Sequence, residues 1–103
     1  MNLETLDAKL KAEAARLEAK VLYEDLPASC QGLAVTKKGR RYIIIRELDS
    51  DFEKRVTFAH ELAHITLGHK GTLMALVDGS DTTAQEEEAW WYAALYWYSA
   101  EVI

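Results

Sequence analysis

The sequence predicts an α+β fold, in which helices pack against one face of a small, mostly antiparallel sheet of about three strands. Three observations carry this prediction: leucines at helical spacing near the N-terminus, a β-branched run beside a glycine turn in the middle, and helix-cap signals before two later segments. Half of the 103 residues are apolar and 28% are charged, which is typical of a globular protein. We therefore expect residues 1–103 to form a single domain.

The first segment reads as a helix followed by a strand. Leucines at positions 3, 6, 10 and 17 form one narrow stripe on a helix from Leu3 to about Lys20. Val21 to Leu26 is a short segment that begins with three apolar residues and ends at Pro27, and it predicts the first strand.

A β-hairpin is predicted next. The runs 32–36 and 41–47 flank Lys37-Lys38-Gly39, in which the glycine can adopt a positive φ. The second run contains three consecutive isoleucines, and such β-branched residues favour a strand that is well covered.

Two helices complete the predicted fold. Asp49, Ser50 and Asp51 are cap-type residues before a helix from about 52 to 67, and Gly68 stands where a helix C-terminus favours a left-handed residue. Thr83 and Glu86 have the spacing of a capping box, so a last helix is expected to begin there.

Charge and cysteine content exclude several classes of function. Twelve basic and seventeen acidic residues give a formal charge of −5, which argues against direct nucleic-acid binding. Cys30 is the single cysteine, so an intrachain disulfide framework is excluded and a cytoplasmic protein is expected. No apolar run is long enough to span a bilayer, so no membrane association is expected.

The predicted middle helix contains the sequence His60-Glu61-Leu-Ala-His64. Histidines at i and i+4 lie on one helix face and can bind one metal ion, while the intervening glutamate can act on a bound water. Fewer than about one in a hundred shuffled chains of this composition would contain the motif. Zinc suits two imidazole nitrogens and one carboxylate oxygen, with a fourth position left for water.

Spacing does not identify the third protein ligand. A metzincin pattern would need glycine at 67 and histidine at 70, so His69 is out of register and is expected at the helix end instead. Glu86, Glu87 and Glu88 stand at the start of the last helix, and the capping box already accounts for Glu86. Spacing alone leaves Glu87 and Glu88 as alternatives.

Residues 55–69 read RVTFAHELAHITLGH, and residues 86–95 read EEEAWWYAAL. These two segments resemble the ImmA/IrrE family of small zinc metallopeptidases, within a resemblance that covers about 17–98. The chain departs from the family at Trp90, where an asparagine or acidic residue is usual, and at Tyr92, where a phenylalanine is usual.

The resemblance implies a minimal zincin-like fold in which His60, His64 and Glu88 bind zinc and Glu61 is the catalytic base. It also implies a zinc-dependent endopeptidase whose protein substrate is a helix-turn-helix repressor of a phage, mobile element or stress response. The alternative is a non-catalytic metal-binding module that acts through its aromatic C-terminal helix.

A contact surface is also predicted on the last helix. If Glu88 faces the metal, helical geometry places Trp90 and Trp97 on the opposite face. Exposed indoles are typical of interface centres, so this face predicts a homodimer or partner contact.

Overall fold

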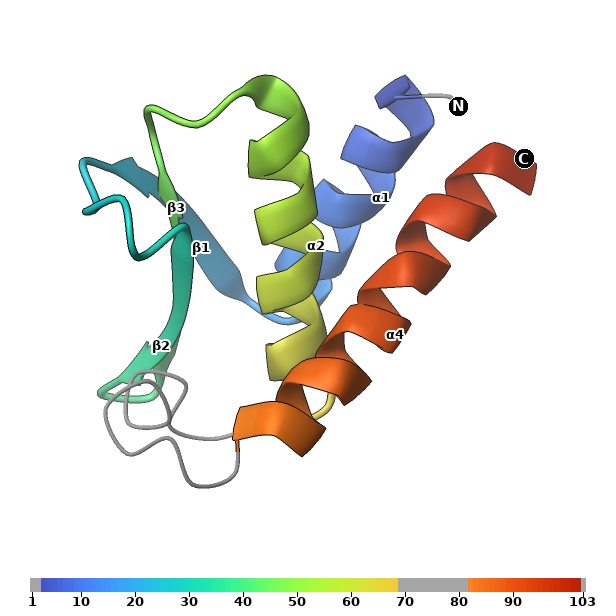
Figure 1. Cartoon of the computed structure of the whole chain (residues 1–103). Helices are drawn as coiled ribbons and strands as arrows, with labels where there is room; N and C mark the ends of the chain where they lie inside the picture. The colour runs from blue at the N-terminus through green and yellow to red at the C-terminus, as the bar shows by residue number, and fades with distance from the viewer. Residues whose placement is uncertain (1–2, 69–81, 103) are drawn as a thin grey trace.

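The computed structural model describes residues 3–68 and 82–102 (Figure 1). It confirms the α+β class, with three helices and a three-stranded sheet in the described ranges. Along the chain the elements are α1 (Leu3–Arg16), β1 (Ala19–Glu24), β2 (Gly32–Lys37), β3 (Arg40–Arg46), α2 (Asp51–Thr66) and α4 (Thr82–Val102).

Helix α1 buries two leucines of the predicted stripe, whereas Leu3 is 40% exposed and Leu17 follows the end of the helix. Leu6, Leu10 and Ala14 recur every four residues and all lie in the core. The helix ends at Arg16, earlier than predicted, because Glu18 adopts a positive φ of 54° and turns the chain directly into β1.

The sheet is mixed rather than mostly antiparallel. Its strand order is β1-β3-β2, with β3 antiparallel to β2 and parallel to β1. Lys38 and Gly39 join β2 to β3 with φ values of 52° and 76°, as expected for the tight hairpin turn. Ile43 and Ile45 of the central strand point to one face and are fully buried there.

Helix α2 begins and ends with the predicted signals. The Ser50 hydroxyl oxygen accepts a hydrogen bond from the Glu53 amide at 3.1 Å, and Gly68 closes the helix with a φ of 74°. Residues 57–64 of α2 are all buried, because the helix packs on the sheet, on α1 and on α4. The Arg55 guanidinium also pairs with both carboxylate oxygens of Asp7, at 2.8 and 3.2 Å, and so ties α2 to α1.

Helix α4 lies against α1 and α2 on the side away from the sheet (Figure 1). It contributes Ala89 and Ala93 to the core, and these small residues let it approach α2 closely. Of the helices described, none is both long enough and apolar enough to cross a membrane.

Candidate metal centre

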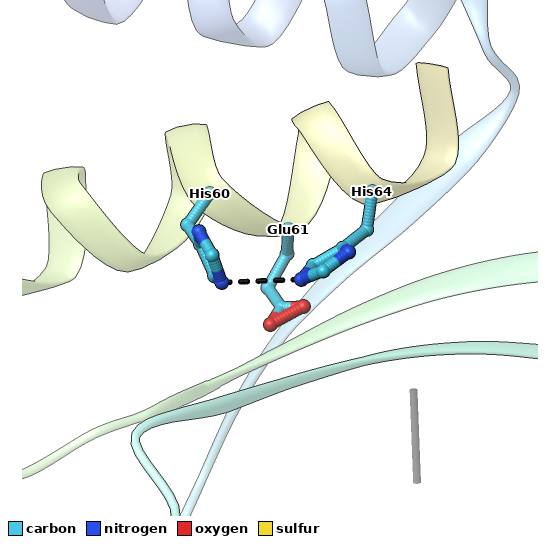
Figure 2. A group of neighbouring side chains, drawn as sticks. All are labelled: His60, Glu61 and His64. Carbon is cyan, nitrogen blue, oxygen red and sulfur yellow. Dashed lines mark hydrogen bonds between the residues drawn. The ribbon is translucent and has the colours of Figure 1, made fainter. Parts of the chain in front are cut away.

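Two histidines of α2 form the centre of the site. His60 and His64 are one helical turn apart, and their Nε2 atoms lie 3.1 Å from each other. Both are buried, with His60 only 8% exposed. Figure 2 shows that both imidazoles leave the same side of α2, as the i, i+4 spacing predicted.

Glu61 lies beside the imidazoles. Its ligand-capable oxygen is part of a cluster in which the donor atoms of Glu61, His60 and His64 lie within 4.8 Å of one another. The carboxylate is buried, and its Oε2 has no hydrogen-bond partner among the described residues. A buried carboxylate oxygen without a hydrogen bond is costly, so this site is one that a cation or a water would stabilise.

A carboxylate from α4 completes the cluster. Glu86 Oε2 lies 2.8 Å from His60 Nε2, and Glu86 Oε1 lies 3.0 Å from His64 Nε2. Both distances are within the range of hydrogen bonds, and which ring nitrogen donates depends on the tautomer of each imidazole. The three side chains therefore present two nitrogens and a carboxylate toward one point from two different helices.

The surroundings of Glu61 disfavour a negative charge on its carboxyl group. Burial, and secondarily the nearby carboxylate of Glu86, raise the pKa of Glu61 to about 8. A divalent cation held by His60, His64 and Glu86 would act in the opposite direction and favour the ionised carboxylate. Two imidazoles and one carboxylate are a donor set that zinc accepts, so the residues fit the expected metal.

In the structure the carboxylate that meets both histidines is that of Glu86, while Glu88 as the third ligand, which the resemblance implies, stays a prediction. Glu87 and Glu88 are exposed, and helical geometry turns them about 100° and 200° away from Glu86. The capping-box prediction obscured Glu86, because it assumed that the helix begins at Thr83. In the structure α4 already includes Thr82, so Glu86 lies in the second turn and faces α2.

The position of the two tryptophans, Trp90 and Trp97, also differs from the prediction, because the α4 face that carries Glu86 is the one turned toward α2. Trp90 is one turn after Glu86, on the same helix face, and its ring stacks on His60 with centroids 4.0 Å apart. Trp97 packs against the core and lies 5.6 Å from the Phe52 ring. Both therefore contact α2 instead of lying on the face opposite the site, although Trp90 is still 46% exposed.

His69, which sequence reasoning placed at the helix end, lies outside the described residues.

Gly32 makes a close approach to α2 that the sequence did not reveal. A Cβ at Gly32 would overlap the methyl group of Thr57 and would lie 3.6 Å from Cγ of Glu61. The first residue of β2 thus lies against the α2 face that carries the site.

Comparison with known proteins is consistent with this geometry. The family model of the IrrE N-terminal-like domain, a peptidase family, matches residues 14–98. The match spans the elements from the end of α1 to α4, including the histidines and Glu86. No curated protein and no solved structure matched the chain.

Proposed function

The chain belongs to the IrrE N-terminal-like peptidase family, and from this premise we propose that it is a zinc-dependent endopeptidase. His60, His64 and Glu86 would bind the metal, and Glu61 would serve as the catalytic base. The observation that carries this proposal is the convergence of Glu86 on both Nε2 atoms, at 2.8 and 3.0 Å. A carboxylate on α4 meets both histidines of α2, so the metal site would join the two helices.

The chemistry follows from the donor set and from Glu61. When bound, a zinc ion would supply Lewis acidity toward water and the scissile carbonyl. Glu61 lies within 4.8 Å of the histidine donors, so its carboxylate can take a proton from the attacking water. The same carboxylate then transfers that proton to the leaving amine nitrogen as the peptide bond breaks. Burial of Glu61 excludes bulk water from the path of this proton.

The substrate peptide has a candidate docking edge in β2. This strand is at one edge of the sheet, and Gly32 at its start lies near Glu61. An extended peptide could add to that edge through main-chain hydrogen bonds, which give affinity with little sequence preference. The resemblance noted above suggests a helix-turn-helix repressor as the protein that supplies this peptide.

The register of the hairpin identifies the free backbone groups on β2. Arg46 donates its amide to the Gln31 carbonyl at 2.8 Å, so the directly opposed pair 31/46 is hydrogen-bonded. Antiparallel pairs alternate, and therefore Val35 bonds Tyr42 whereas Ala34 directs its N–H and C=O outward. Ala34 is thus the expected main-chain contact for a substrate strand.

Glu61→Gln tests the catalytic proposal. We expect the variant to keep about one equivalent of zinc and to cleave peptides from an unstructured library at least about 100-fold more slowly than wild type. Co-expression with candidate repressors should yield fragments with the wild type only. Equal cleavage by the variant would contradict the role of Glu61, and an absence of zinc in the wild type would contradict the metal site.

One observation favours a second candidate, a binding module whose metal is structural. Trp91, Leu95 and Tyr98 are exposed along one side of α4, with Trp91 77% exposed. Under this alternative, the physiological effect survives the Glu61→Gln substitution and is lost when these side chains are made polar.

A further inference from the structure

Trp90 contacts the site but has no role in the chemistry proposed above. Its ring stacks on the imidazole of His60, with centroids 4.0 Å apart and ring planes inclined by 27°. The indole is 46% exposed while His60 is 8% exposed, so Trp90 covers His60 on its solvent side. Trp91, the next residue, is more exposed and makes no ring contact among those found for the described residues.

Helix α4 contacts His60 in two different ways. On α4, Glu86 and Trp90 are separated by one turn and share a face. Glu86 meets the Nε2 edge of His60 at 2.8 Å, while Trp90 lies on the flat face of the same ring. Edge and face contacts together fix both the position of Nε2 and the plane of the imidazole.

His64 is held differently. Its ring meets His60 edge-on, with centroids 4.6 Å apart and planes inclined by 80°, and it is almost fully buried. Glu86 contacts His64 as well, at 3.0 Å, but His64 is only 2% exposed, whereas His60 lies at the more solvent-exposed side of the pair. A ligand at such a position binds metal better when a neighbouring group fixes its ring beforehand.

We propose that Trp90 is a positioning residue for the metal site, which holds the His60 imidazole in its ligand orientation and shields it from water. This inference rests on the proposed function, because it assumes that His60 binds zinc. Trp90 acts through His60 and needs no contact with the metal or the substrate.

Zinc affinity tests the proposal directly. We compare wild type with Trp90→Ala, Trp90→Phe and the matched control Trp91→Ala, using competition with a chromophoric zinc chelator. A stacked aromatic pair contributes enough for Trp90→Ala to weaken zinc binding about two- to tenfold. Trp90→Phe keeps an aromatic face and should restore part of the loss, and Trp91→Ala should match the wild type.

A spectroscopic measurement separates positioning from general folding. Cobalt(II) quenches a nearby indole, so titration of the wild type with cobalt should quench tryptophan fluorescence. Trp90→Phe should lose most of this quenching, while Trp91→Phe keeps it. Cobalt absorption bands in each variant verify that the metal is bound, and circular dichroism verifies the fold.

Two results would overturn the inference. One is zinc affinity of Trp90→Ala equal to that of the Trp91→Ala control. The other is cobalt quenching of tryptophan fluorescence in Trp90→Phe that equals the quenching in the wild type. This second measurement tests the inference even if Trp90→Ala does not fold. Failure of the wild type itself to bind zinc is a different result, because it contradicts the proposed metal site as a whole.

Discussion

The site has two unlike sides, and their difference indicates which residues can be changed without harm to the fold. On the sheet side, Glu61 is buried, and its Cγ lies near Gly32 at the start of β2. On the α4 side, Glu86 and Trp90 are each partly exposed, with 41% of the Glu86 side chain accessible. Changes on the sheet side should therefore affect stability and catalysis, and changes on the α4 side should affect metal binding.

The largest expected effect is on the α4 side. Glu86→Ala should weaken zinc binding by more than about 100-fold. Loss of a residue that only supports a metal ligand costs up to about 100-fold in metal affinity, and loss of a ligand itself should cost more. Glu88→Ala is the matched control and should change the zinc dissociation constant little, because Glu88 is exposed and turned away from Glu86. Chelator competition measures both. A stronger loss in Glu88→Ala would restore the ligand assignment made from the family resemblance.

The next effect is on the sheet side and depends on pH. In the folded state the pKa of Glu61 is raised to about 8. In the unfolded chain Glu61 has its lower, ordinary pKa and loses its proton at lower pH, so the folded state binds more protons between the two pKa values. Metal-free wild type should therefore lose stability as the pH rises from about 5 to about 8.

In the Glu61→Gln variant this side chain is neutral at every pH. The difference between the wild type and the variant therefore isolates the contribution of Glu61 to the pH dependence of stability, because His60, His64 and Glu86 are present in both proteins. Each pKa unit corresponds to about 1.4 kcal/mol, so the two proteins should diverge by up to a few kcal/mol over that range. Urea unfolding at several pH values with a chelator present measures the divergence. Parallel pH profiles would show that Glu61 is not held neutral by burial.

A smaller effect is expected where β2 meets α2. Gly32→Ala would place a Cβ in overlap with the Thr57 methyl group and 3.1 Å from the Ile44 carbonyl oxygen. Such overpacking destabilises a fold by about 1–3 kcal/mol.

Thr57→Ser removes the overlapping methyl group and should relieve part of this cost. A double-mutant cycle by urea unfolding measures the coupling. Strict additivity of the two substitutions would contradict the close contact between β2 and α2.

The smallest effect should appear in catalysis alone. Ala34→Pro removes an outward N–H from the edge of β2, and the loss of one main-chain hydrogen bond should lower kcat/KM about tenfold for any peptide that the wild type cleaves. Ala34→Val keeps the N–H and serves as the control. Zinc affinity should be unchanged in both variants, and normal turnover by a folded Ala34→Pro would exclude this docking edge.

Local sequence patterns were enough to predict the half of the site that lies on α2. The i, i+4 spacing places His60 and His64 on one face of any helix, and Ser50 and Gly68 mark where that helix begins and ends. The hairpin was predictable for a similar reason, since the Lys38-Gly39 turn joins strands that are adjacent in the chain. These features depend on residues close together in sequence.

The other half of the site depended on how separate elements meet. The parallel pairing of β1 with β3 joins segments on either side of β2, and no local pattern specifies it. Among Glu86, Glu87 and Glu88 the sequence offered three similar side chains on three sides of one helix. Which of them meets the histidines is set by the rotation of α4 about its axis.

The sequence by itself therefore determined the His60-Glu61-Leu-Ala-His64 motif on one helix and the α+β class. The tertiary structure alone decided that Glu86 meets the histidines, that Trp90 stacks on His60 and that Gly32 lies against the site. The physical reason is that α4 is apolar or aromatic on most sides, so its hydrophobic pattern does not select one buried face. Its rotation is fixed instead by Ala89 and Ala93, whose small side chains allow close packing on the core.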